Sequence, residues 1–170
     1  MNPPLDRLLR ARRRVIPANG LAFEVFEAGE GDRLALLLHG FPQHAVSWHN
    51  QVTFLAELGY RVWAVNQRGY GGTSRPKQRE DYALDQLTGD VAGLIDASEA
   101  TSVTLIGHDW GAFVAWTFAI RAIRPLARED AMTRLIFSAL LALNIRFYRQ
   151  ALPRPTVAKA KGPRSKTIGS

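Results

Sequence analysis

Residues 102–116 read SVTLIGHDWGAFVAW, and this stretch decides the fold. The apolar run SVTLI leads into a short segment in which Gly107 and Gly111 flank Asp109 at a distance of two residues. The segment after Gly111 carries apolar residues at helical spacing. The pattern predicts a buried strand, a tight turn and a helix, with Asp109 presented at the turn.

Two roles fit Asp109 at this turn. The flanking glycines allow a sharp strand-to-helix turn without Cβ collisions, and the helix N-terminus favours an ionised carboxylate. An ionised aspartate is a usable nucleophile for covalent catalysis. Asp109 is equally suited to be a simple N-cap of the helix, because aspartate is a favoured cap. The pattern G-x-D-x-G alone leaves both roles open.

The rest of the chain alternates between strand and helix patterns. Apolar or alternating runs mark strands at residues 21–29, 34–38 and 60–65, and helical spacing marks residues 45–59, 82–98 and 110–123. This alternation predicts an α/β fold with a mostly parallel sheet flanked by helices. Ligands of such sheets bind beyond the carboxyl ends of the strands.

Three unusual loops fall at predicted strand ends, namely HGFPQH, NQRGYGG and HDWGA. The backbone amides of Phe41 and Trp110 would point to one site there and could stabilise negative charge on an oxygen. His39 also fits an ordinary buried histidine. The sequence has no glycine-rich phosphate-binding motif and no cysteine, so we expect no cofactor and no thiolate metal site.

The segments LLLHGFP, NQRGYGGTSRP and VTLIGHDWGAFVAW together resemble the α/β-hydrolase fold family and, within it, the epoxide hydrolase branch. The resemblance covers about residues 19–124. It implies that Asp109 attacks a carbon of a small apolar epoxide and forms an alkyl-enzyme ester. A water activated by a histidine would then hydrolyse the ester to a diol. The other site residues that it implies are the oxyanion-hole amides of Phe41 and Trp110, His39 shaping that hole, and the turn glycines Gly107 and Gly111.

Two alternatives stay open beside this interpretation. Haloalkane and haloacetate dehalogenases also use an aspartate in G-x-D-x-G, and their substrate is a halide. Typical haloalkane dehalogenases carry Asn after the HG pair, so Phe41 favours epoxide hydrolases but leaves haloacetate dehalogenases open. The second alternative is a non-catalytic remnant or binding module that uses the same cleft.

The sequence departs from the family pattern in two places. Asn66 stands where the family often has Asp, which puts no catalytic role in doubt. In the family, a cap domain, an acid and a histidine follow the nucleophile, whereas the four histidines of this sequence (His39, His44, His49 and His108) all precede Asp109. The resemblance therefore predicts a truncated or frameshifted relative that is inactive alone. Its exposed apolar surface would favour self-association.

Composition and charge exclude other classes. The 170 residues are 46% hydrophobic and 22% charged, which is typical of one globular domain. The net charge of +7 lies in the two ends, because residues 1–14 carry five Arg and one Asp and residues 151–170 carry five basic residues and no acid. We expect solvated ends, neither nucleic-acid nor membrane binding, and a cytoplasmic location, since no apolar run approaches a membrane span or a signal core.

The predicted organisation has four parts. A basic segment occupies residues 1–18, with a short helix at residues 5–14. The hydrolase-like domain covers residues 19–128, a divergent helical segment covers residues 129–152, and a basic disordered tail covers residues 153–170.

Overall fold

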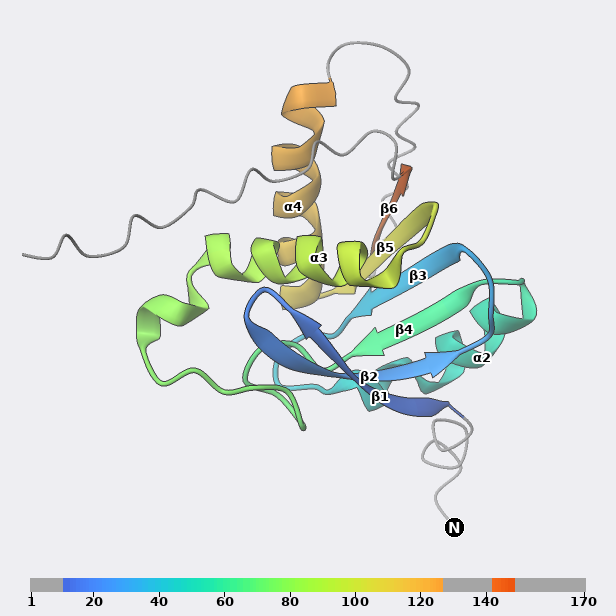
Figure 1. The fold of residues 1–170 in the computed structure, drawn as a ribbon, viewed down its shortest axis with the longest axis horizontal. Coiled ribbons are helices and arrows are strands. Elements are labelled where there is room, and N and C mark those ends of the chain that lie inside the picture. Colours follow the sequence, from blue (N-terminus) through green and yellow to red (C-terminus); the bar gives the residue numbers. More distant parts are fainter. Residues whose placement is uncertain (1–10, 127–141, 149–170) are drawn as a thin grey trace, which may run out of the picture.

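The computed structural model describes residues 11–126 and 142–148 (Figure 1). Six strands form one sheet in the order β1-β2-β4-β3-β5-β6, with helices packed on it. The strands are β1 (Arg12–Ala18), β2 (Leu21–Ala28), β3 (Arg33–Leu38), β4 (Arg61–Val65), β5 (Ser102–His108) and β6 (Ala142–Tyr148). The α-helices are α2 (His49–Glu57), α3 (Leu84–Ser98) and α4 (Trp110–Leu126), and short 3₁₀ turns lie at η1 (Ala45–Trp48) and η2 (Arg79–Tyr82).

The three central strands run parallel. Leu38 at the end of β3 pairs with Val65 of β4 on one side and with Gly107 of β5 on the other. The carboxyl ends of the three strands therefore lie level at one edge of the sheet. The expected α/β fold is confirmed, and the sheet as a whole is mixed, because β2 pairs antiparallel to β4 and β6 pairs antiparallel to β5.

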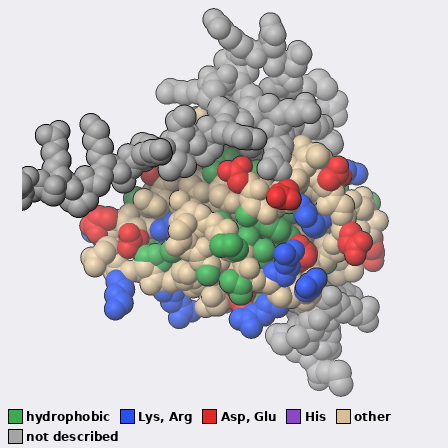
Figure 2. Space-filling model, viewed as in Figure 1, with side chains coloured by type: hydrophobic (Ala, Val, Ile, Leu, Met, Phe, Trp, Pro, Cys, Tyr) green, Lys and Arg blue, Asp and Glu red, His purple; other side chains and the backbone are tan. Residues whose placement is uncertain are grey.

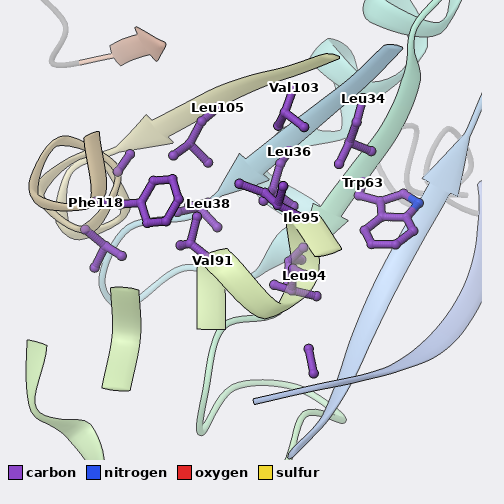
Figure 3. Packing of buried hydrophobic residues seen from close by; sticks show 14 of the residues in the cluster. Leu34, Leu36, Leu38, Trp63, Val91, Leu94, Ile95, Val103, Leu105 and Phe118 are labelled. Atoms are coloured by element: carbon purple, nitrogen blue, oxygen red, sulfur yellow. The ribbon is translucent and has the colours of Figure 1, made fainter. Parts of the chain in front are cut away.

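From Leu34 to Leu38, strand β3 is uniformly apolar because helices cover both of its faces. Leu34, Leu36 and Leu38 belong to the cluster formed with α3 and α4, and Figure 3 shows them beside Val91, Leu94, Ile95 and Phe118. Ala35 and Leu37 alternate with them and belong to the second cluster, with Trp48 and Val52. Since successive side chains of a strand point to opposite faces, the two clusters lie on opposite sides of the sheet.

The N-terminal strand extends the sheet beyond the expected domain boundary at residue 19. Strand β1 pairs antiparallel with β2, so the predicted helix at residues 5–14 is wrong for its last three arginines. Glu24 and Glu27 on β2 form ion pairs with Arg13 and Arg14, and these contacts favour an extended chain. The basic charge of the N-terminal segment is thus partly paired inside the fold; its first ten residues lie outside the described part.

Charges of both signs lie on the face of the molecule that Figure 2 draws. On the face that Figure 2 draws, Lys and Arg side chains lie among Asp and Glu side chains, with hydrophobic side chains visible between them. None of the described helices has the length and apolar character needed to cross a membrane.

The C-terminal strand corrects a second expectation. Residues 142–148, which helical spacing placed in a helix, form β6 along the free edge of β5. Leu143, Ile145 and Phe147 alternate with polar residues, so the same segment also carries the period of a strand. The unpaired backbone of the β5 edge favours the strand. The remainder of the predicted helical segment, and the predicted tail at residues 153–170, lie outside the described residues.

A buried carboxylate fixes the loop that follows β4. Glu24 of β2 accepts hydrogen bonds from the side chain of Asn66 at 2.6 Å and from the amide of Gly72 at 2.6 Å. Burial raises the pKa of Glu24, but these hydrogen bonds and the Arg13 contact outweigh it and leave the pKa below its usual value. The side-chain oxygen of Asn66 accepts from the amide of Ala45 at 2.8 Å. Asn66 therefore donates to one neighbour and accepts from another, which aspartate cannot do.

Replacing Asn66 by Asp should destabilise the fold by about 3 kcal/mol at pH 7, the size expected of an uncompensated buried charge. The two adjacent carboxyl groups would share a proton, so their folded-state pKa would rise above the unfolded value. The lost stability should therefore return as the pH falls toward the unfolded carboxyl pKa. Urea unfolding at several pH values measures this effect.

The double variant Asn66→Asp, Glu24→Gln is the matched control for this experiment. It exchanges donor and acceptor between the two positions, so it should regain most of the stability at pH 7. An Asn66→Asp protein as stable as the parent at pH 7 would show that the amide is not needed as a donor.

Candidate functional site at the ends of β3, β4 and β5

Asp109 lies at the turn between β5 and α4. Its φ of 51° is in the left-handed region, which few residues other than glycine adopt and which Asp tolerates better than most. Its carbonyl oxygen accepts the amides of Ala112 at 3.0 Å and Phe113 at 3.1 Å, which begins the helix. The side chain is exposed and points out of the sheet edge instead of serving only the helix.

The glycines of this turn permit close backbone approach. A Cβ on Gly111 would lie 2.3 Å from the carbonyl oxygen of Leu38 and 2.5 Å from that of His39. A Cβ on Gly107 would lie 2.5 Å from the carbonyl oxygen of Gly111. These neighbours are backbone atoms that cannot rotate away. The turn therefore packs directly against the end of β3, and only glycine fits at these two positions.

Two backbone amides hold the carboxylate of Asp109. The amide of Phe41 donates to Oδ1 at 2.9 Å, and the amide of Trp110 donates from the first turn of α4. These hydrogen bonds, in that order of strength, hold the pKa of Asp109 below its usual value, and the imidazole of His108 acts in the same direction. The carboxylate is thus ionised at neutral pH and faces solvent.

His39 lies beneath this arrangement, fully buried. Its Nε2 accepts the amide of Gln67 at 3.1 Å, so the proton of the neutral ring is on Nδ1, which donates to the carbonyl of Gly40 at 2.9 Å. Burial lowers the pKa of His39, which keeps the ring neutral. The imidazole therefore ties the loop after β3 to the loop after β4, and both of its nitrogens are engaged.

His108 points toward the HGFP loop. Its Nδ1 lies 3.1 Å from the side-chain oxygen of Gln43. Two residues that sequence reasoning did not single out thus help to place the loop. They are Gln43 and Gly40, on which a Cβ would lie 2.7 Å from the Cβ of Asp109 and 2.8 Å from its Oδ1.

A cleft of about 640 Å³ opens above Asp109. Four aromatic residues contribute to its lining, which includes Phe41, Tyr70, Tyr82, Leu87, Asp109 and Trp110. The predicted residues Phe41, Asp109 and Trp110 thus come together, whereas His39, Gly107 and Gly111 support them from below. The two tyrosines were missed. The motif NQRGYGG marked the loop of Tyr70 without assigning the residue, and no sequence signal marked Tyr82.

Arg68, which is part of the cleft lining, is paired with a carboxylate. Arg68 donates to both carboxylate oxygens of Asp90 on α3, at 2.8 Å from Nε and 2.6 Å from Nη2. Both side chains are buried, and Nη1 of Arg68 donates to the carbonyl of Asp81 at 2.6 Å. All three nitrogens of the guanidinium therefore donate to protein oxygens. Within the described residues, no group of three potential ligand side chains could hold a metal ion.

Known families and proteins match this chain. The family model of the alpha/beta hydrolase fold matches residues 35–159. Epoxide hydrolase A of Mycobacterium tuberculosis is 41% identical over 154 residues, which is 90% of this chain and 43% of that protein. This match is longer than the stretch 19–124 that carries the resemblance in the sequence.

Solved structures of epoxide hydrolases share the described fold. Epoxide hydrolase A from Mycobacterium thermoresistibile is 46% identical with a TM-score of 0.62, over 64% of this chain and 34% of that one. A variant of an epoxide hydrolase from Bacillus megaterium, complexed with its product (R)-3-[1]naphthyloxy-propane-1,2-diol, is 35% identical with a TM-score of 0.61, over 64% of this chain and 37% of that one. This chain spans less than half the length of each of these three proteins.

The position of Asp109 can be tested through its pKa. Carbon-13 NMR of the side-chain carboxyl groups should give Asp109 a pKa below the usual aspartate value. Gly40→Ala should raise this pKa, because the added methyl group pushes the carboxylate away from the amide of Phe41.

The stability of the unmodified protein should depend on the ionisation of the Asp109 carboxyl group. The contribution of ionised Asp109 is complete above the unfolded carboxyl pKa and is lost as the pH falls through the lower folded value. Asp109→Asn should lack this component. Thermal melts by circular dichroism would check that Gly40→Ala remains folded. An unchanged Asp109 pKa in a folded Gly40→Ala protein would contradict the described packing.

Proposed function

This chain belongs to the α/β-hydrolase fold family, and on that premise we propose that it carries the ester-forming site of an epoxide hydrolase. The observation that supports the proposal most directly is the carboxylate of Asp109, ionised by the amides of Phe41 and Trp110 at the floor of an aromatic cleft. The similarity to epoxide hydrolases over 90% of the chain supports it independently.

In the proposed reaction, Asp109 is the nucleophile. The amide of Phe41 holds Oδ1, so the other carboxylate oxygen attacks a carbon of the epoxide. The ring carbon–oxygen bond breaks, an alkyl ester forms on Asp109, and the epoxide oxygen takes up a proton. Oδ1 becomes the carbonyl oxygen of this ester. The amides of Phe41 and Trp110 then form an oxyanion hole for the charge that develops there when water attacks.

The proposed substrate is a small, uncharged epoxide with an apolar or aromatic substituent. Aromatic side chains line the cleft, and Arg68, the cation among its described lining residues, is neutralised by Asp90. The product reported for the Bacillus megaterium relative, a diol with a naphthyl group, has this character. Phe41 offers an amide but no side-chain N–H to a departing halide, which favours an epoxide over a haloalkane. A cytoplasmic location remains part of the proposal.

Hydrolysis of the ester needs a base to activate water, and none of the four histidines is among the residues that line the described cleft. Both nitrogens of His39 are engaged, and His108 pairs with Gln43. No histidine follows Asp109 in these 170 residues. We therefore propose that this chain forms the ester and releases little diol.

Incubation with styrene oxide tests this proposal. Intact-mass analysis should show the addition of one epoxide molecule, and peptide mapping should place it on Asp109. Asp109→Asn should abolish the adduct, because the amide is not nucleophilic. Asp96→Asn, which alters an exposed aspartate of α3, should form the adduct at the parent rate.

Three outcomes would contradict the proposal. No adduct at Asp109 would favour the non-catalytic binding module, and rapid diol formation would show that a water-activating base is present. Reaction with haloacetate in preference to the epoxide would select the dehalogenase alternative.

A further inference from the structure

Tyr82 contributes an aromatic ring to the cleft from an element that takes no part in holding Asp109. It is the last residue of η2, it lines the cleft, and it is 38% exposed. The amides at the carboxylate of Asp109 belong to Phe41 and Trp110. The ring of Tyr82 is therefore a part of the cleft lining to which the reaction at Asp109 assigns no role.

The ring of Tyr82 is held at its hydroxyl end. The hydroxyl donates to the carbonyl of Pro76 at 3.0 Å. The same end of the ring lies over Gly69, because a Cβ on that glycine would lie 3.0 Å from both Cε1 and the hydroxyl oxygen of Tyr82. Gly69 has a positive φ of 84°, which side chains tolerate poorly. The ring thus occupies the space that a side chain at residue 69 would fill.

The backbone that carries Tyr82 is also fixed. Arg68 donates to the carbonyl of the preceding residue, Asp81, at 2.6 Å, and the carboxylate of Asp81 accepts the amide of Gln78 at 3.2 Å. Because Arg68 is itself paired with Asp90 on α3, this backbone is tied to the buried part of the fold. A ligand that packs against Tyr82 therefore does not have to order it first, which lowers the cost of binding.

The cleft has room for much more than the reacting group. An epoxide is a three-membered ring, and one of its carbons must lie at the free carboxylate oxygen of Asp109. Most of the cleft of about 640 Å³ is left for the substituent, and the remaining lining includes Tyr70 and Tyr82. The ring of Tyr70 packs against His39 and His44. Within the described part of the chain, the ring of Tyr82 stacks on no other aromatic side chain, so its exposed surface is open to a ligand.

We propose that Tyr82 is a specificity-determining residue that favours an epoxide with an aryl substituent over one with a saturated ring of the same size. This inference rests on the proposed function and names the substrate class that the cleft selects. A substituent of either kind buries apolar surface against Tyr82. An aryl group gains in addition the favourable electrostatics of an offset-stacked or edge-to-face pair.

The contact acts on affinity and leaves the chemical step unchanged. Tyr82 packs against the substituent, whereas the bonds that form and break lie at Asp109. The contact is therefore the same in the bound epoxide and in the transition state, so it raises the rate at low substrate concentration but not the rate of bound substrate. A residue that only maintained the shape of the reaction site would alter the rate of bound substrate.

Two matched substrates test this selectivity. Phenyl glycidyl ether and cyclohexyl glycidyl ether carry the same epoxide on the same linker and differ in whether the terminal ring is aromatic. Rates of ester formation at Asp109 would be measured by peptide mapping over a range of concentrations. At low concentration the unmodified protein should prefer the phenyl compound, and Tyr82→Leu should lower this preference about fivefold, as expected for the loss of one aromatic pair. At saturation the rates should stay within about twofold of the unmodified protein.

Two control variants separate the ring from other effects. Tyr82→Phe keeps the ring and loses the hydroxyl that binds Pro76, so it should retain the preference. Phe54→Leu replaces an aromatic residue of α2 that is exposed outside the described cleft lining, and it should also retain the preference. An unchanged preference in Tyr82→Leu would overturn the proposal, as would an equal loss in Tyr82→Phe. Slower reaction of both compounds at saturation in Tyr82→Leu would also overturn it, because Tyr82 would then shape the reaction site.

Failure of the proposed function has a different signature. In that case the unmodified protein would form no ester at Asp109 with either glycidyl ether, and the role of Tyr82 would fall with it. Ester formation at equal rates with both compounds at low concentration would leave Asp109 as the nucleophile and refute the role of Tyr82 alone.

Discussion

The parallel pairing of β3 with β5 is the constraint on which the site depends. Leu38 pairs with Gly107, so the loop after β3 and the turn after β5 leave the sheet side by side. Gly111 then packs against the carbonyl oxygens of Leu38 and His39, at distances that exclude a side chain. The amide of Phe41 reaches the carboxylate of Asp109 only because the two backbones approach this closely. A slip of one residue in this register would turn every side chain of β5 to the other face and separate the amide from its acceptor.

Backbone amides stabilise the negative charge of Asp109 more than any side chain does. A carboxylate held by amides needs no cation beside it, and the guanidinium of the cleft lining, that of Arg68, is neutralised by Asp90. Amides fixed by secondary structure also need no rearrangement when charge moves from one oxygen to another. Neutral His39 fits this arrangement, because a charged imidazole below the loop would have to be desolvated without an acid beside it.

The sequence predicted the central elements because their apolar patterns are unambiguous. The run from Leu34 to Leu38 is a strand covered on both faces, and Leu87, Val91 and Leu94 mark the buried face of α3. It failed where two patterns compete. Arg12, Arg13 and Arg14 suit an exposed helix, but the acids on β2 favour a strand, and this pairing is not visible locally. Residues 142–148 carry both helical and strand periods. Tyr70 and Tyr82 were missed because their position in the cleft depends on how the loop after β4 folds back.

The two halves of ester chemistry make different demands on a fold, and the described residues meet one of them. Forming the ester requires an ionised carboxylate and fixed dipoles, and both come from the loops that follow β3 and β5. Hydrolysing the ester requires a base that titrates near neutrality and faces the ester with a free nitrogen or oxygen. Such a group cannot be buried and doubly hydrogen-bonded as His39 is, because its engaged nitrogens leave no place for a water proton. The same contacts that make His39 a rigid support for the nucleophile therefore disqualify it as the base.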